Sequence, residues 1–182
     1  ETILYGLAWT GTGHATVCLP GTHAKWARLS GGHLAGFRTM MTGEMFALLG
    51  KASILRHTVG ISGWSDDDFA AAVAEAHAAP ADCLGKLFGL RAGPLLFRDA
   101  APLGSARLSG LLIGAEIATC MAADDAPLCL VATGRMSDRY AAALTTLGID
   151  FGKADAEDAV RKGLFAIAAG IWPGRGLLET NA

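Results

Sequence analysis

The sequence lacks the features that identify a function most directly. It has no excess of positive charge, because 15 Lys and Arg residues are outnumbered by 17 Asp and Glu residues. The chain therefore lacks the net positive charge that is typical of nucleic-acid-binding proteins. It has no C-x-x-C pair, and its five histidines do not stand at ligand spacing from its cysteines, so no zinc site is predicted. We expect the scattered cysteines to be reduced core thiols of a cytoplasmic protein, namely Cys18, Cys83, Cys120 and Cys129.

Motifs of common nucleotide and hydrolase chemistry are missing as well. The chain has no G-x-x-x-x-G-K-[ST] phosphate loop, no G-x-G-x-x-G dinucleotide motif and no Ser-His-Asp arrangement. It has no long hydrophobic run, since the best candidate, Leu108–Ala123, contains Glu116 and falls short of the roughly 18–20 apolar residues of a membrane span. No signal-peptide pattern opens the chain. We therefore expect no membrane association.

Apolar residues are abundant, at 52% of the chain, and many are Ala, alongside 24 Gly. This composition is typical of tight helix–sheet packing, and a missing partner domain or a second subunit would also explain it. Because the first residue is Glu1 rather than Met, we expect a fragment or a processed piece of a longer chain.

Hydrophobic patterning predicts three strands near the start of the chain, after the end of a helix at residues 2–9. The strands are Ala15–Leu19, Lys25–Leu29 and Leu34–Met41, with a hairpin turn at Ser30-Gly31-Gly32. The first strand is continuously apolar, as a buried strand is. The second alternates, as expected for a half-exposed strand.

The middle of the chain is predicted to be helical, and the last third to alternate strand and helix. Ser65 followed by Asp66-Asp67-Asp68 favours a helix start, with capping preferred over metal binding for the acidic run. The predicted elements are helices Gly43–Ser53, Phe69–Ala79, Cys83–Gly89 and Ser105–Ala123, with a loop at Arg91–Pro102, then strand Leu128–Ala132, helix Met136–Leu147, strand Ile149–Phe151, helix Ala156–Ala169 and a frayed tail from Pro173.

This order of elements predicts an α/β fold in a single domain, residues 1–182. Three antiparallel strands followed by parallel strands would form a mixed sheet with helices on both faces. The layout matches one half of a ribonuclease-H-like, actin-like ATPase fold.

The most informative local feature is the turn Gly21-Thr22-His23, which follows an apolar strand. Gly permits close backbone approach to a ligand, and a Thr hydroxyl with adjacent N–H groups forms an anion-binding concavity. Closure of an ordinary hairpin is the alternative. Lys25 favours anion binding, because on an extended strand its side chain would face the same side as that of His23.

A second turn, Thr133-Gly134, also follows a buried strand and precedes a helix. Such a turn offers N–H groups and the positive end of a helix dipole to a phosphate or nucleotide. Alone it is a weak signal, but two glycine turns after buried strands indicate a nucleotide cleft.

Two carboxylates stand out from the rest. Glu44 follows Thr42-Gly43 at a helix start, where its alternative role is pairing with the helix dipole. Glu116 is the only charged residue of Leu108–Ala123. Its alternative role is that of a buried or half-buried carboxylate satisfied by Arg107 or Arg135.

Four segments of the sequence resemble 2-dehydro-3-deoxygalactonokinases, sugar kinases of the actin/hexokinase/Hsp70 superfamily. They are Glu1-Thr2, Leu19–Trp26, Phe37–Glu44 and Leu108–Glu116. The resemblance implies phosphorylation of the 6-hydroxyl of 2-dehydro-3-deoxy-D-galactonate in galactonate catabolism, with ATP and Mg²⁺ as cofactors. It also implies that this chain is the C-terminal, nucleotide-binding half of a two-domain kinase whose N-terminal half is absent, with a homodimer as a further option. The first phosphate and magnesium motif would belong to that half, so no metal ligand is expected here.

The resemblance assigns roles to residues around the first turn. Gly21 and Thr22 would face the β- and γ-phosphates, with His23 beside them as a phosphate contact. Lys25 would be a catalytic residue that contacts phosphate or the substrate carboxylate. Glu1 would follow the catalytic base, which would fall just before the chain starts.

The resemblance also assigns the second turn. Ala132-Thr133-Gly134 would be the adenosine motif, with Arg135 and Met136 near the base or ribose, although it holds one glycine where the family usually has a pair. Further residues would contact substrate or support the site, namely Thr42, Gly43, Glu44 and Glu116. Two alternatives stay open: a non-catalytic actin-like module that binds nucleotide, and a kinase for a different sugar acid.

Overall fold

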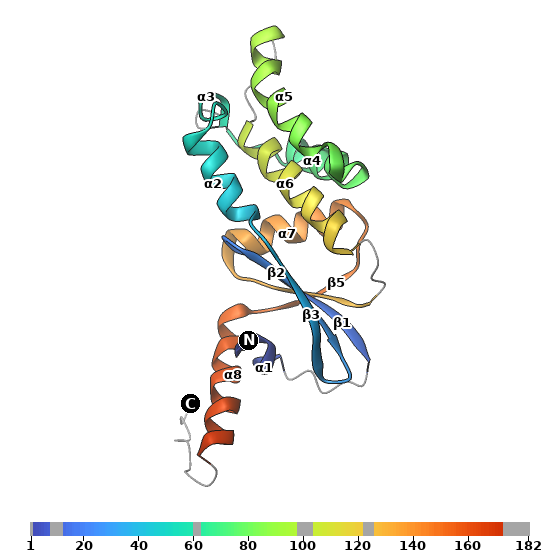
Figure 1. The fold of residues 1–182 in the computed structure, drawn as a ribbon, viewed down its shortest axis with the longest axis vertical. Coiled ribbons are helices and arrows are strands. Elements are labelled where there is room, and N and C mark those ends of the chain that lie inside the picture. Colours follow the sequence, from blue (N-terminus) through green and yellow to red (C-terminus); the bar gives the residue numbers. More distant parts are fainter. Residues whose placement is uncertain (1, 8–12, 60–62, 98–103, 122–125, 173–182) are drawn as a thin grey trace.

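A five-stranded sheet separates two groups of helices in the computed structural model, which describes residues 2–7, 13–59, 63–97, 104–121 and 126–172 (Figure 1). The helices are α1 (Thr2–Gly6), α2 (Thr42–Ala52), α3 (Arg56–Val59), α4 (Asp66–Ala78), α5 (Cys83–Leu96), α6 (Gly104–Met121), α7 (Gly134–Thr146) and α8 (Ala156–Ile171), with a 3-10 turn at Pro80–Asp82.

The sheet has the strand order β3-β2-β1-β4-β5. Its strands are β1 (His14–Leu19), β2 (Ala24–Ser30), β3 (His33–Met40), β4 (Leu128–Val131) and β5 (Phe151–Ala154). The first three pair antiparallel, and β4 and β5 are parallel to β1, which confirms the predicted mixed sheet. The predicted hairpin turn is present, with Gly31 and Gly32 at φ of 55° and 78°.

Two details of the sheet differ from the sequence prediction. The sequence predicts the last strand at Ile149–Phe151, but β5 begins only at Phe151. The N–H of Ile149 still donates to the carbonyl oxygen of Leu144 at 3.0 Å, so the chain there closes the end of α7 and is not yet extended. The half-exposed pattern predicted for the second strand is also wrong at Trp26 and Ala27, which are both buried.

Helices cover both faces of the sheet, which is why Trp26 and Ala27, neighbours on opposite faces of β2, are both buried. On one face α1 and α8 pack over a cluster that includes Val17 and Ala27 (Figure 1). On the other face α4, α6 and α7 pack over a cluster that includes Cys18 and Trp26. The helices predicted on both faces are therefore confirmed.

Helix α6 packs along α4 at very close range. A Cβ atom on Gly110 would lie 2.5 Å from the carbonyl oxygen of Phe69, and one on Gly114 would overlap the carbonyl oxygen of Val73. Only glycine permits backbones to approach this closely. The packing fixes α6 as a central support, and its other face contributes Ser109, Ile113 and Glu116 to the candidate site.

Helix α5 is longer than the sequence predicts. The predicted helix ends at Gly89 and is followed by a loop, whereas α5 continues to Leu96. Leu87 and Leu90 are buried in the cluster formed with α6, so tertiary packing carries the helix past Gly89. Pro94 lies within the last turn of this helix. The end of the predicted loop, at residues 98–103, lies outside the described residues, as does the tail from Pro173.

The acidic run at the start of α4 has the predicted capping role. The Ser65 hydroxyl accepts a hydrogen bond from the N–H of Asp68 at 3.2 Å, and the aspartates occupy the first turn. Within the described part of the chain, no group of three or more His, Cys, Asp or Glu residues could hold a metal ion.

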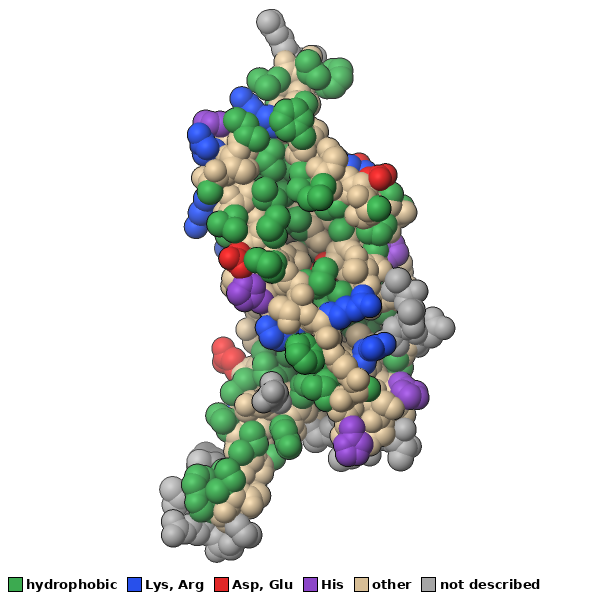
Figure 2. Space-filling view, in the orientation of Figure 1, with side chains coloured by type: hydrophobic (Ala, Val, Ile, Leu, Met, Phe, Trp, Pro, Cys, Tyr) green, Lys and Arg blue, Asp and Glu red, His purple; other side chains and the backbone are tan. Residues whose placement is uncertain are grey.

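Hydrophobic side chains are exposed at both ends of the long axis, over α5 and over α8 (Figure 2). Leu84 and Phe88 of α5 are 77% and 63% exposed, and Leu164 and Phe165 of α8 are 57% and 59% exposed. None of the described helices is both long and apolar enough to cross a membrane. Part of the apolar composition is therefore surface rather than core.

Candidate functional site

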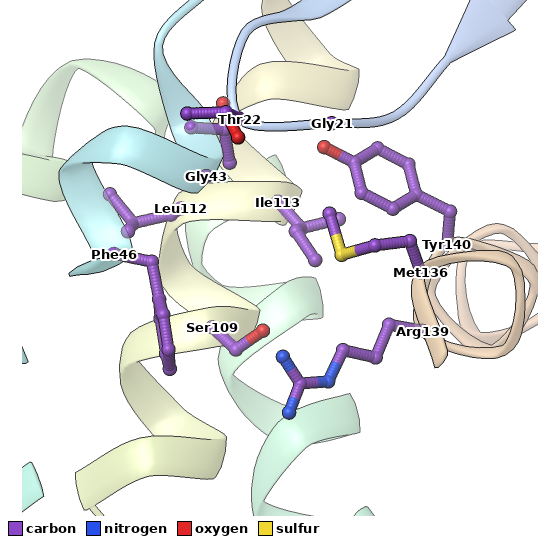
Figure 3. A pocket seen from close by; sticks show the side chains of 11 residues that line it. Gly21, Thr22, Gly43, Phe46, Ser109, Leu112, Ile113, Met136, Arg139 and Tyr140 are labelled. Atoms are coloured by element: carbon purple, nitrogen blue, oxygen red, sulfur yellow. The ribbon is translucent and has the colours of Figure 1, made fainter. Parts of the chain in front are cut away.

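A cavity of about 390 Å³ lies where the turn after β1 meets α2, α6 and α7. Its lining residues are Gly21, Thr22, Thr42, Gly43, Phe46, Ser109, Leu112, Ile113, Met136, Arg139 and Tyr140. Figure 3 shows Gly21 and Thr22 at one end, Ser109 and Arg139 at the other, and apolar side chains between them. The structure thus brings together three predicted groups, the first turn, the Thr42-Gly43 pair and Met136.

The start of α2 is pressed against the first turn. A Cβ atom on Gly43 would overlap the carbonyl oxygen of Gly21 and lie 2.8 Å from the Cα of Thr22. The N–H of Glu44 donates to the carbonyl oxygen of Thr22 at 2.9 Å, and Met41 supplies no side-chain cap to the helix. A helix N-terminus and a Gly-Thr turn therefore meet at the same end of the cavity, an arrangement that favours an anion.

His23 and Lys25 lie beside the cavity and are absent from its lining. The Nε2 atom of His23 is 2.5 Å from Oε2 of Glu44, and Lys25 Nζ donates to the carbonyl oxygen of His23 at 3.2 Å. His23 belongs to the turn before β2 begins at Ala24, so the side-chain alternation of a strand does not apply to it. Glu44 lies in the first turn of α2, as predicted, and pairs with His23 across the rim.

The second predicted turn contributes one residue to the cavity. Met136 lines it, whereas Ala132, Thr133 and Gly134 do not. Gly134 has a φ of 56° at the start of α7, and the N–H of Ala132 donates to Ala154 of β5 at 3.3 Å.

A second cavity, of about 480 Å³, adjoins the first along α7. Arg135 and Trp64 line it, and Arg139 lines both cavities. The Arg139 guanidinium carbon lies 4.4 Å from the centre of the Trp64 ring and 5.8 Å from that of Phe46. Burial and the neighbouring Arg135 lower the pKa of Arg139.

Sequence reasoning missed six side chains of the first cavity, namely Phe46, Ser109, Leu112, Ile113, Arg139 and Tyr140. The last two stand three and four residues after Met136, so helical spacing from the second turn could have found them. Ser109 belongs to the segment Leu108–Glu116, and it is only 4% exposed. Its hydroxyl has no hydrogen-bond partner among the described residues, and Figure 3 shows it at the cavity.

Glu116 is buried beneath the first cavity, with 1% of its surface exposed. The Trp26 indole N–H donates to it at 2.7 Å, the Tyr140 hydroxyl at 3.0 and 3.1 Å to its two oxygens, and the Thr42 hydroxyl donates to Oε2. Burial raises the pKa of Glu116, and hydrogen bonds from Thr42, Trp26 and Tyr140 oppose that rise.

The predicted arginine partners of Glu116 are therefore wrong. Arg107 instead pairs with Glu75 of α4 at 2.8 Å, and Arg135 lines the second cavity. The actual partners are uncharged, and they come from β2, α2 and α7, so no local sequence pattern points to them. The remaining predicted residue, Glu1, lies outside the described residues.

The residues present fit a phosphorylated ligand better than a metal ion. A glycine cradle and a helix N-terminus occupy one end of the first cavity, and the buried Ser109 hydroxyl offers an unused hydrogen bond at the other. In an α/β protein, an arrangement of this kind suits a phosphate-bearing ligand.

Comparison with known proteins places the chain in a family. A sequence model described as "2-keto-3-deoxy-galactonokinase" matches residues 1–167, and the chain belongs to this family. A Rhizobium meliloti protein assigned as a 2-dehydro-3-deoxygalactonokinase is 42% identical over 95% of this chain and 58% of its own length. The Escherichia coli 2-dehydro-3-deoxygalactonokinase is 34% identical over 84% of this chain and 53% of its own length.

A solved structure has the same fold. The crystal structure of a Sinorhizobium meliloti protein assigned as a 2-dehydro-3-deoxygalactonokinase superimposes with a TM-score of 0.88 at 41% identity. The match covers 94% of this chain and 59% of that one. The chain therefore spans little more than half the length of the relatives it matches.

Proposed function

We propose that this chain is the C-terminal, nucleotide-binding half of a cytoplasmic sugar-acid kinase. The reaction is transfer of the γ-phosphoryl group of ATP to the 6-hydroxyl of 2-dehydro-3-deoxy-D-galactonate. The names of the relatives support the substrate, and their greater length supports a second, N-terminal half. The strand order β3-β2-β1-β4-β5 supports a ribonuclease-H-like domain.

One observation carries the proposal, namely that the first turn, the start of α2 and Met136 surround a single cavity. The Thr22 hydroxyl, the backbone N–H groups of Gly21-Thr22 and those of Thr42 and Gly43 at the start of α2 bind the β- and γ-phosphates. The apolar walls at Ile113 and Met136 hold the nucleoside, and the cavity excludes water around it. Arg135 precedes Met136 on α7 and lines the second cavity. From there its side chain approaches the adenine base or the ribose of the nucleotide.

Catalysis in this proposal is positioning and charge stabilisation. ATP, bound with Mg²⁺, supplies the phosphoryl group. Lys25 and His23, at the rim beside the turn, contact the transferred phosphoryl group or the carboxylate of the sugar acid. The catalytic base and the metal ligands belong to the N-terminal half, with Glu1 following the base.

The whole reaction is tested by joining this chain to the remaining segment of the Rhizobium meliloti relative and measuring ADP release with the sugar acid. The joined protein is expected to turn over, and this chain alone is expected to bind ADP without turnover. Robust turnover by this chain alone would contradict the two-domain account. ADP binding without phosphoryl transfer in the joined protein would favour a non-catalytic module, and turnover only with another sugar acid would change the substrate.

Thr22→Ala in the joined protein tests the role of the turn. Removing one donor that stabilises developing charge costs about 100-fold or more in kcat, so a loss of about that size is expected without loss of the fold. Thr146→Ala is the matched control, because this exposed threonine of α7 bonds only the carbonyl oxygen of Ala142 within its own helix. Equal turnover by the two variants would show that the Thr22 side chain has no role in the reaction.

A further inference from the structure

The segment Leu108–Glu116 places a carboxylate where phosphate binding does not require one. Glu116 is 1% exposed, and its three partners come from three elements, Trp26 of β2, Thr42 of α2 and Tyr140 of α7. None of these partners carries a positive charge. A carboxylate that is buried beneath a site for anions, with no cationic hydrogen-bond partner among the described residues, calls for a physical explanation.

Two of its partners, Thr42 and Tyr140, line the first cavity. Thr42 is the first residue of α2 and precedes Gly43, which abuts the turn. Its hydroxyl has one proton to donate and two lone pairs that accept. Whichever group receives that proton decides what Thr42 can offer to a ligand.

The ionisation of Glu116 controls the direction of this hydrogen bond. When Glu116 is ionised, the Thr42 proton is directed to Oε2, and the hydroxyl can only accept from a ligand. When Oε2 carries a proton, that proton is donated to the Thr42 oxygen. The Thr42 proton is then free to be donated into the cavity, while Trp26 and Tyr140 still donate to Oε1.

We propose that Glu116 is a positioning residue that sets the donor direction of the Thr42 hydroxyl, and that the phosphates of the ligand bind the form in which Glu116 is neutral. Protonation also removes a negative charge from beneath the phosphates. The inference rests on the proposed function and specifies how the site is adapted to an anion.

Among Glu116 and the titratable groups around it, Glu116 is the one that changes its ionisation in the pH range of a carboxyl group. The neighbouring titratable groups are Cys18 of β1, Cys120 of α6 and Tyr140 of α7, with Cys129 of β4 beside Cys18 and Arg38 of β3 beside Cys120. Burial raises the pKa of both Cys18 and Cys120 and of Tyr140, so all three stay neutral over the range in which a carboxyl group titrates. His23 and Glu44 form a hydrogen-bonded pair at the rim of the site.

The sign of the pH dependence follows from this linkage. A ligand that prefers neutral Glu116 binds most tightly below the folded-state pKa of that group, and its affinity falls as the pH rises through it. Burial raises this pKa above its usual value of 4.5, so the fall occurs nearer to neutrality than for an exposed glutamate.

Glu116→Gln separates this mechanism from a loss of structure. The amide keeps the shape, accepts from Trp26 and Tyr140 through its oxygen, and always donates to Thr42 through its N–H group. We expect this variant to bind ADP about tenfold more tightly than the wild type at alkaline pH, and equally tightly at acidic pH. A residue that only supported the fold would weaken binding at every pH when replaced.

The experiment is calorimetric titration of the 182-residue chain with ADP at a series of pH values from acidic to alkaline. At each pH the result is expressed as the ratio of the ADP affinities of Glu116→Gln and the wild type. The ratio cancels every pH dependence that the two proteins share, including the titration of ADP itself. Glu75→Gln is the matched control, because that carboxylate pairs with Arg107 and Lys86 on the outside of α4, and its ratio is expected to stay constant.

Thr42→Val is the second variant, and it tests the inference even if Glu116→Gln fails to fold. It is expected to lower ADP affinity at acidic pH and to leave it nearly unchanged at alkaline pH. A constant ratio for Glu116→Gln, or an equal loss at every pH for Thr42→Val, overturns the role of Glu116 and leaves the proposed function standing. An absence of ADP binding by the wild-type chain overturns both.

Discussion

Replacing Gly43 with alanine is expected to lower the turnover of the joined kinase by about 100-fold, the loss that a misplacement of about 1 Å can cause in an active site. The added Cβ would overlap the carbonyl oxygen of Gly21 and approach the Cα of Thr22 to 2.8 Å. Both atoms are backbone and cannot rotate away, so α2 and the phosphate turn must separate. Their separation also displaces Thr42 from Glu116.

Gly43→Ala is expected to lower the stability of the domain only modestly. Overpacking costs about 1–3 kcal/mol, and the lower entropy of the unfolded alanine chain returns roughly 0.4–1 kcal/mol. Thermal unfolding followed by circular dichroism measures the stability, and ADP release measures the turnover. Gly50→Ala in the same helix is the control, because its Cβ would meet only the side chain of Val59, at 3.2 Å. Wild-type turnover by Gly43→Ala would show that the close contact has no part in the site.

The double variant Gly110→Ala/Gly114→Ala is expected to destabilise the domain by about 2–4 kcal/mol. Alanine is the better helix former by roughly 1 kcal/mol at each position, which alone would stabilise α6. The new methyl groups, however, would meet the backbone of α4 at Phe69 and Val73, where no side chain can move aside. Steric repulsion therefore exceeds the gain in helix propensity.

The control for this prediction is another double Gly→Ala substitution in a helix, and it is expected to raise the free energy of unfolding rather than lower it. Gly85→Ala/Gly89→Ala in α5 places both methyl groups where no described atom outside the local helix backbone lies within 4 Å, so the helix propensity is gained without overlap. Urea unfolding of the two double variants gives the comparison. If both stabilised the chain, the close packing of α4 on α6 would be refuted.

Much of the fold is predictable because local patterns and tertiary packing agree along most of the chain. The apolar run of β1 and the Gly31-Gly32 turn each select one structure through backbone preference and burial. Helix α5 is one exception. Its glycines and Pro94 predict a loop, but the burial of Leu87 and Leu90 against α6 outweighs those local preferences.

The candidate site is predictable only where its chemistry belongs to a local motif. The Gly21-Thr22 turn and the Thr42-Gly43 pair carry signals within a few residues, and the structure places both at one cavity. The hydrogen bonds of Glu116 carry no such signal, because Trp26 is 90 residues away in sequence and Thr42 is 74 residues away. The sequence suggests arginines as charged partners of Glu116, whereas in the structure neutral donors bind its carboxylate.

The pairing of α1 with α8 also affects the order in which the domain can form during synthesis. These helices seal the face of the sheet that carries Val17, Ala27 and Leu29, and α8 ends only at Ile171. The strands β1, β2 and β3 are synthesised long before that helix, so a nascent chain leaves this face uncovered until α8 has been made. Truncation within α8 would therefore make that exposure permanent.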